Sequence, residues 1–384
     1  MPEKYGQRSP GALAWQRFKQ NKLSLSGLAF ISIAVIIALI GPLIVPDNSR
    51  NANNIMLPVE MKKPGFTVTI LKQYKDGEPP VNSLWQILWQ GKTLPYRSIP
   101  VSQWKVQKDK LLYKRYTGQD TASTAKPRQI KLAKAAFHLS PEDPNYRFDG
   151  QTVRFNDHKG QVRQIALKKL QTKVKRKCFE EQTFWLGTDR FGRDMLSRLI
   201  LGTRVSLSVG IIAVGISLII GLMIGAIGGF FRGWIDELVQ WLINVVWSIP
   251  TLLLVISLSL ALGKGIVQVF IAVGLTMWVE VARVVRGQVI SLREAGFVEA
   301  GRALGMRAPY IIRRHIMPNI LGPVIVISAA NFATAILLEA GLSFLGIGVQ
   351  PPTPAWGYMI NDHRSFIILD SAYLAVLPGI AIML

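Results

Sequence analysis

Hydrophobic residues gather in long windows of this chain that contain no charged side chain. About 20 apolar residues cross the roughly 30 Å hydrocarbon core of a bilayer as a helix, and four windows reach that length. They run from Leu23 to Pro46, from Val205 to Phe231, from Leu238 to Gly263 and from His315 to Leu338. Each window therefore predicts one membrane crossing.

Two further windows are shorter. Gly265–Val279 is long enough to cross if Glu280 lies at the membrane boundary, and a last apolar segment follows Asp370 and has only 14 residues. The sequence thus predicts an all-α polytopic membrane protein with six crossings. Either the chain is a truncated product or its last helix is unusually short.

The first window has to be distinguished from a cleaved signal peptide. A signal peptide has an apolar stretch of about 7–15 residues followed by small residues at the cleavage site. Here the apolar stretch is longer and ends in Gly41-Pro42-Leu43-Ile44-Val45-Pro46. We therefore expect a retained helix.

Basic residues in short flanking segments predict the orientation, because Lys and Arg near helix ends stay on the cytoplasmic side. They cluster in the N-terminal tail and between the fourth and fifth windows, at Lys4, Arg8, Arg17, Lys19, Lys22, Arg283, Arg286, Arg293, Arg302, Arg307, Arg313 and Arg314. With six crossings, the chain alternates between the two sides, so both termini are expected on the cytoplasmic side of a cytoplasmic membrane.

The segment between the first two crossings is long and basic. It holds 26 Lys plus Arg against 11 Asp plus Glu from Pro46 to Glu180, so it carries 15 of the 22 net positive charges. Long domains translocate largely regardless of charge, so this excess does not overturn the orientation. Nucleic acid, another partner of basic surfaces, is not expected on the outer side.

Alternating apolar and polar residues predict β structure in this insert. Phe66–Ile70 alternates, and Tyr146–Phe155 places Asp149-Gly150 between two alternating runs, which is a strong hairpin signal. A further strand is expected over Val162–Leu167. The basic run Lys168–Lys177 is interpreted as a solvated face, with contact to anionic lipid headgroups as the alternative.

Small residues spaced by four follow one face of the second window. Such a stripe lets helix backbones approach closely, which drives packing in lipid. The stripe consists of Ala213, Ser217, Gly221, Gly225 and Gly229. We expect this helix to lie inside a bundle.

Three other features of the membrane part carry weaker signals. Pro250 predicts a bend in the third crossing, which either serves a moving gate or fits a neighbouring helix. Glu280 lies three residues before Arg283, so an ion pair is favoured over a role in a transport path. Glu339 lies near the outer end of the fifth window, where an ionisable group usually faces a partner or a wet cavity.

The segment between the fourth and fifth crossings is predicted to form two short helices on the cytoplasmic side. Phe297–Leu304 is rich in helix formers, and Gly305 suits the C-terminal cap. Pro309 fits the first turn of a second helix, which Pro318 is expected to stop. Ala300, Gly301 and Ala303 leave part of the first helix nearly bare, so a groove on another protein can receive it.

This segment resembles the EAA loop of ABC importer permeases. The resemblance rests on Glu299-Ala300-Gly301, then Gly305, then His315-Ile316-Met317-Pro318, with Gly301 in place of an alanine, His315 in place of an isoleucine and Met317 in place of a leucine. Leu186–Arg198 and Leu342–Gly357 resemble the dipeptide and oligopeptide permease subfamily, specifically its C-type subunit. The long insert is not part of that resemblance.

The resemblance implies a domain plan and a mechanism. Residues 1–46 would form the cytoplasmic tail and first transmembrane helix, 47–183 an extracytoplasmic insert, and 184–384 the permease core of a six-helix importer. Separate ATPase subunits would bind ATP and push on the loop. The expected coupling residues are Glu299, Ala300, Gly301 and Gly305, with Arg302 and Arg307 as contacts to the ATPase or simple anchors of the inside orientation.

The expected partners are a second, related permease subunit, two ATPase subunits, an extracytoplasmic substrate-binding protein and the lipid bilayer. The cargo would be di- or oligopeptides or nickel. No cofactor and no catalysis are expected in this chain, because Gly-x-x-x-x-Gly-Lys-[Ser/Thr] and His-Glu-x-x-His are absent and Cys178 is the only cysteine. A membrane-anchored ligand-binding or scaffold protein and an ATP-independent secondary transporter remain as alternatives.

Overall fold

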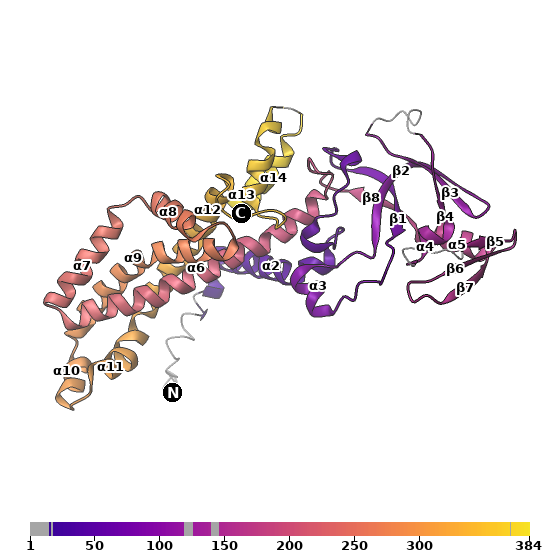
Figure 1. Ribbon diagram of the computed structural model, residues 1–384. Helices are drawn as coiled ribbons and strands as arrows, with labels where there is room; N and C mark the ends of the chain where they lie inside the picture. Colours follow the sequence, from indigo (N-terminus) through magenta and orange to yellow (C-terminus); the bar gives the residue numbers. More distant parts are fainter. Residues whose placement is uncertain (1–14, 17, 119–125, 140–145, 369) are drawn as a thin grey trace, which may run out of the picture.

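The computed structural model describes residues 15–16, 18–118, 126–139, 146–368 and 370–384. An elongated bundle of helices occupies one end of the molecule, and a separate β-containing insert occupies the other (Figure 1). The insert lies between the first two long helices in the sequence, as predicted.

Four helices of the described chain are long and apolar enough to span a membrane. They are α2 (Lys22–Ile44), α6 (Met195–Phe231), α9 (Ile266–Arg293) and a continuous helix over 308–344 that contains α11 (Ala308–Ile311), a π-helical turn η3 (Ile312–Ile316) and α12 (Met317–Phe344). These helices contain the first, second, fourth and fifth predicted windows. The chain is a multi-pass membrane protein.

The third predicted crossing is two helices instead of one bent helix. α7 (Trp234–Trp247) and α8 (Thr251–Leu262) meet at an angle of 87°. Pro250 precedes α8 directly and has no amide hydrogen to continue the ladder of α7. The bend was expected, but its sharpness was not.

The last apolar window contains a shorter helix, α14 (Tyr373–Met383). It packs against α13 (Trp356–His363), with the short helix η4 (Arg364–Ile367) between the two. The sixth predicted crossing therefore corresponds to a helix of 11 residues.

The small-residue stripe of α6 is a packing face, as predicted, and the helix packed against it is α9. Its five residues, Ala213, Ser217, Gly221, Gly225 and Gly229, are all buried. A methyl group added at Gly225 would lie 2.5 Å from the carbonyl oxygen of Ala282, and one at Gly221 would lie 2.5 Å from Cβ of Val281. The backbones of α6 and α9 are thus too close for larger residues along this seam.

The two glutamates of the membrane part differ in surroundings. Glu280 makes no ion pair with any described residue, so the predicted pair with Arg283 is wrong; the Arg283 guanidinium instead lies 3.2 Å from the ring centre of Trp247. Glu339 is fully buried, and its Oε1 accepts a hydrogen bond of 2.7 Å from the Ser343 hydroxyl. Glu339 therefore faces a partner on its own helix, which fits one of the two expectations for it.

The insert is built on a five-stranded antiparallel sheet. Its strand order is β4-β3-β2-β1-β8, from β1 (Phe66–Tyr74), β2 (Tyr96–Gln107), β3 (Lys110–Arg115), β4 (Arg128–Lys131) and β8 (Phe179–Phe184). β8 pairs with β1 in the register Phe66↔Phe184. The last strand before the membrane core thus closes back on the first strand of the insert.

A second, three-stranded sheet contains the predicted hairpin. β5 (Arg147–Phe148) and β6 (Thr152–Asn156) pair antiparallel around Asp149-Gly150, and β7 (Val162–Ala166) pairs with β6. The Asp149 side chain accepts hydrogen bonds from the amides of Gln151 and Thr152, at 3.0 and 2.6 Å. The predicted hairpin at Asp149-Gly150 is confirmed. The strands predicted over Phe66–Ile70 and Val162–Leu167 are confirmed as well, as β1 and β7.

Two helices cover these sheets. α4 (Leu132–Ala136) and the amphipathic α5 (Leu167–Lys177) bury Leu132, Leu170 and Val174 in the core of the insert. The lysines and the arginine at 168, 169 and 175–177 are exposed, which fits both the solvated face and the alternative contact with lipid headgroups.

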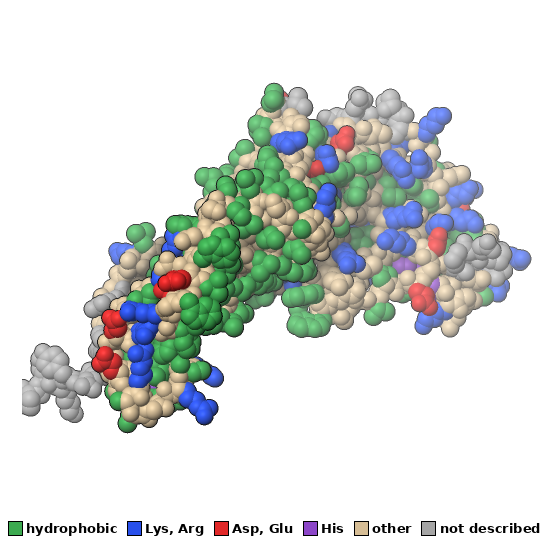
Figure 2. Space-filling model, turned by 60° about the vertical axis from the view of Figure 1, so that its left-hand side comes forward, with side chains coloured by type: hydrophobic (Ala, Val, Ile, Leu, Met, Phe, Trp, Pro, Cys, Tyr) green, Lys and Arg blue, Asp and Glu red, His purple; other side chains and the backbone are tan. Residues whose placement is uncertain are grey.

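Exposed tryptophans lie near both ends of the bundle. The short helix α3 (Leu84–Gln90) exposes Trp85 and Trp89, and Trp234 lies directly after the other end of α6. The Arg204 guanidinium lies 4.3 Å from the ring centre of Trp89, which ties α3 to α6. Tryptophan prefers membrane–water boundaries, and apolar side chains cover the bundle between these ends (Figure 2).

Candidate functional site

The loop between α9 and the continuous helix begins with α10 (Gly296–Ala303), as predicted within one residue. The amide of Gly305 donates to the carbonyl of Arg302 at 2.9 Å, and the amide of Met306 donates to that of Gly301 at 3.1 Å. Gly305 has a φ of 74°, a conformation that strains residues with a Cβ. The predicted glycine cap is therefore confirmed.

α10 is fixed to the bundle by its inner face. Val298 is fully buried in a cluster that includes Phe230 at the end of α6, Val289 of α9 and Ile311 of α11. Gly301 is also buried, with Met306 and Ile311 next to it. α10 is thus a rigid projection held by apolar contacts, at the end of the bundle opposite the insert (Figure 1).

The outer face of α10 carries apolar side chains that nothing in the described chain covers. Phe297 and Leu304 are 42% and 76% exposed, and Ala300 lies between them on the same face. Tyr310, just after the turn, is also exposed. We call Phe297, Ala300 and Leu304 the apolar ridge. Exposed apolar surface outside the membrane is typical of a protein interface.

The structure places the six predicted coupling residues on both faces of this loop. Glu299, Ala300, Arg302, Gly305 and Arg307 are exposed, whereas Gly301 is buried. The Arg302 guanidinium lies 5.2 Å from the ring centre of Phe230, so it packs along the end of α6. Gly301 therefore lies on the packed face of α10. A methyl group added there would make only ordinary van der Waals contacts, with Met306 and Ile311.

Phe297 and Leu304 are not among the residues that the sequence predicted for coupling. Their spacing relative to Ala300 puts all three on one helix face, and this spacing is the signal in the sequence that indicates the ridge.

The expected stop at Pro318 is wrong. The helix continues from Ala308 to Phe344, and Pro318 lies in the first turn of α12. The preceding π-helical turn explains this, because the amide of Met317 bonds to the carbonyl of Ile312, five residues earlier. The wider turn accommodates a residue that has no amide hydrogen to donate.

A second constellation lies at the opposite end of α6, within the motif Leu186–Arg198. Arg193 Nε donates to Oδ2 of Asp189 at 2.6 Å, and Nη1 of Arg193 donates to Asn53 at 3.1 Å. Arg190 pairs with Asp362 of α13 at 2.6 Å. Asp189, Arg193 and Asp362 are buried, so this network fastens α6, α13 and the start of the insert to one another.

Within the described residues, no group of three or more His, Cys, Asp or Glu side chains is arranged to hold a metal ion. Among the described residues, the exposed face of α10 is therefore the candidate interaction surface, and the motif at 186–198 connects structural elements to one another.

Two family descriptions match the chain. Residues 217–384 match "Binding-protein-dependent transport system inner membrane component", and residues 9–58 match "N-terminal TM domain of oligopeptide transport permease C". Over these two ranges the chain is similar to transport permeases. Residues 59–216, which contain most of the insert, lie outside both matches.

Curated relatives agree with this assignment. The permease is 42% identical over 200 residues to the dipeptide transport system permease protein DppC of Alkalihalophilus pseudofirmus, and 36% identical over 200 residues to the glutathione transport system permease protein GsiD of Pectobacterium atrosepticum. Both matches cover 52% of this chain and 66% of the relative, just under two thirds. The oligopeptide transport system permease protein OppC of Bacillus subtilis is 40% identical over 178 residues, 46% of this chain and 58% of the relative.

Solved structures that resemble the permease include an inward-facing MetNI methionine ABC transporter, at 18% identity and a TM-score of 0.40, covering 49% of this chain and 91% of that one. An amino acid ABC transporter has 20% identity and a TM-score of 0.37, covering 49% of this chain and 85% of that one. The resemblance to an importer permease that the sequence motifs indicated is confirmed by the family matches and the relatives.

Proposed function

We propose that this permease is a transmembrane subunit of an ATP-driven importer, coupled to separate ATPase subunits through α10. The apolar ridge carries the proposal, because Phe297, Ala300 and Leu304 form an exposed apolar face on a helix whose opposite face is held in the bundle through Val298. A rigid helix with an uncovered apolar face transmits a push into the bundle instead of absorbing it.

The coupling follows from how α10 is held. Val298 and Ile311 connect α10 to α9 and to the continuous helix over 308–344. Movement of α10 by a closing pair of ATPases would therefore shift these helices as rigid bodies and exchange an inward opening for an outward one. Glu299, Arg302 and Arg307 would contribute polar contacts at the rim, with Arg302 shared with Phe230.

The other partners and the location belong to the same proposal. A second permease subunit completes the translocation path, and a substrate-binding protein delivers the cargo on the outer side. ATP is bound by the partner subunits, and this chain performs no catalysis. The N-terminus and α10 lie on the cytoplasmic side of a cytoplasmic membrane, and the insert lies on its outer side.

Peptides are the proposed cargo. The names of the relatives refer to dipeptides, oligopeptides and glutathione, which are all peptide-like molecules with free carboxylates. The chain is matched over only part of those relatives, so the cargo needs a direct measurement.

The test is ATP-dependent uptake of a labelled peptide by proteoliposomes that contain the permease and its cognate subunits. Gly305→Val strains the cap of α10, and we expect it to reduce uptake at least tenfold while the complex still inserts. Gly346→Val is the matched control, since Gly346 also has a positive φ, of 76°, and open space around it, but lies after α12.

Equal uptake by the Gly305→Val and Gly346→Val variants would refute the coupling role. Uptake that does not require ATP would identify a secondary transporter instead, and the absence of uptake by the unmodified complex would favour a scaffold or ligand-binding role.

A further inference from the structure

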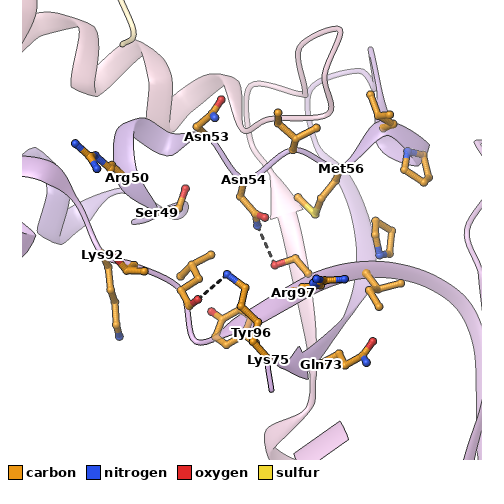
Figure 3. A pocket seen from close by; sticks show the side chains of 18 of the residues that line it. Ser49, Arg50, Asn53, Asn54, Met56, Gln73, Lys75, Lys92, Tyr96 and Arg97 are labelled. Carbon is orange, nitrogen blue, oxygen red and sulfur yellow. Dashed lines mark hydrogen bonds between the residues drawn. The ribbon is translucent and has the colours of Figure 1, made fainter. Parts of the chain in front are cut away.

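The connection between β1 and β2 makes a long excursion from the sheet. Neighbouring antiparallel strands are usually joined by about 2–5 residues, whereas residues 75–95 join these two. The Lys75 ammonium donates to the carbonyl of Leu94 at 3.1 Å, which is drawn as a dashed line in Figure 3, and the Lys75 amide donates to the carbonyl of Pro95 at 3.0 Å. The excursion is therefore closed at its base, and it contains the helix α3.

α3 is tied to the bundle at the level where the apolar window of α6 begins. Arg204 is the last charged residue before the charge-free window Val205–Phe231. Its Nη1 donates to the carbonyl of Leu88 at 2.6 Å, and its guanidinium lies 4.3 Å from the ring centre of Trp89. Because charged side chains stay near the surface of the hydrocarbon core, Arg204 places α3 at the boundary of the bilayer.

α3 leaves its large apolar side chains uncovered by the described chain. Trp85 and Trp89 are 78% and 70% exposed and lie one turn apart on one face, and Leu84 is exposed as well. None of the seven residues of α3 is buried. So short a helix is marginal in water on its own, and burial of these side chains in an apolar medium would stabilise it.

α3 also has the sidedness of an interfacial helix. Gln86 and Gln90 lie one turn apart, on the face next to that of Trp85 and Trp89. Helices with an apolar and a polar face lie in the plane of the membrane surface, with the apolar side chains toward the acyl chains and the polar ones toward water. Seven residues are too few to cross the bilayer, so α3 would remain at one surface.

The neighbour of α3 is a helix at the edge of the bundle. α3 packs against α2, of which only Ala38, Gly41 and Pro42 are buried. Near the same end, α2 exposes Leu43 and Ile44. The uncovered face of α3 therefore continues the apolar surface that a membrane-spanning α2 presents to lipid.

Cations gather where α3 ends. The amide of Lys92 donates to the carbonyl of Asn48 at 2.8 Å. Gly91 approaches the exposed Arg50 so closely that an added Cβ would lie 2.8 Å from the Cα of Arg50. Together with Arg204, these side chains provide the positive charge that meets headgroup phosphates beside an interfacial helix.

We propose that α3 lies in the headgroup boundary of the bilayer and anchors the insert to the membrane surface. Trp85 and Trp89 enter the boundary between headgroups and acyl chains, where tryptophan is enriched, and Gln86 and Gln90 face the headgroups and water. The partner is a phospholipid surface. The inference gives the excursion between β1 and β2 a function, and the coupling role of α10 does not depend on it.

The test is fluorescence quenching of the purified full-length chain in nanodiscs. A bimane label is attached to the thiol introduced by Trp85→Cys in a Cys178→Ala background. The nanodisc contains either ordinary phospholipid or phospholipid brominated near the headgroup end of its acyl chains. We expect the brominated lipid to reduce the fluorescence at least twofold, whereas iodide in the buffer should have little effect.

Three further labelling positions serve as comparisons. Leu84→Cys keeps both tryptophans of α3 and should respond as Trp85→Cys does. Gln90→Cys lies on the polar face and should respond less to brominated lipid and more to iodide. Val162→Cys is the control outside the membrane, because Val162 is 50% exposed on β7, at the end of the insert far from the bundle (Figure 1); it should respond to iodide alone.

Quenching of the label at position 85 by iodide alone, or an equal response to brominated lipid at positions 85 and 162, would overturn the inference. The same measurement in the assembled transporter identifies a protein occupant. Loss of the lipid response there, without a gain in iodide quenching, would show that another subunit covers α3 and would also overturn the inference. The proposed function fails separately, when ATP-driven uptake is absent, whatever the label at position 85 reports.

Discussion

Arg193 and Asp189 form a buried ion pair at the start of α6, with 2.6 Å between Nε and Oδ2 and side chains that are 4% and 0% exposed. The same arginine bonds to Asn53, and a second carboxylate, Asp362 of α13, lies 3.9 Å away. This pair thus connects the base of the insert to two helices of the bundle.

Arg193→Ala should destabilise the permease strongly. Removal of one partner leaves Asp189 as a buried charge without its main counter-ion, which typically costs about 3–5 kcal/mol. Thermal unfolding of the detergent-purified protein measures this loss. Arg232→Ala is the control, because its pair with Glu294 is largely exposed and such pairs contribute about 0–1 kcal/mol. Equal losses in the two variants would contradict the role of burial.

Gly225→Leu should separate α6 from α9. The backbone of Ala282 leaves no room for a side chain at Gly225, and forced overpacking of this kind costs about 1–3 kcal/mol or more. We expect a lower midpoint of thermal unfolding. Gly215→Leu on the same helix should have little effect, because nothing lies within 4 Å of an added Cβ there. A similar shift for both variants would mean that the stripe is not the packing face.

Cys178 should report the folding of the insert. Its side chain is fully buried, and burial raises the pKa of its thiol to about 11. Only the thiolate reacts with maleimides, so a raised pKa means less thiolate at any given pH. We expect slow labelling at pH 7.5 in the folded chain and rapid labelling after denaturation.

The rate of Cys178 labelling should also depend on pH differently in the folded and the unfolded chain. Labelling of the folded protein should continue to rise between pH 8 and 10, whereas labelling of an unfolded chain should level off above its ordinary pKa of about 8.5. The chain contains a single cysteine, so no other thiol contributes. Fast labelling of the native protein at pH 7.5 would show that Cys178 is not buried.

The sequence predicted the elements whose signal is local. The charge-free windows predicted four long helices, the spacing of Gly221, Gly225 and Gly229 predicted the α6 seam, and Asp149-Gly150 predicted the hairpin. Gly305 was predicted as a cap because a glycine after a run of helix formers has few other roles. In each case neighbouring residues carry the information.

The failures have a common physical reason, which is that they depend on contacts between distant segments. Arg283 stacks on Trp247 of another helix instead of pairing with Glu280. Pro318 is tolerated because the π-helical turn before it widens the backbone. The buried position of Gly301 depends on Ile311, and no pattern within α10 alone predicts it.

The most direct test of the central claim is site-specific photo-crosslinking in the assembled transporter. A photo-reactive residue in place of Leu304 should crosslink to a nucleotide-hydrolysing subunit, and one in place of Ile368, which is 90% exposed and lies after α13, should not. Crosslinks to that subunit from position 368, or none from position 304, would contradict coupling through the apolar ridge.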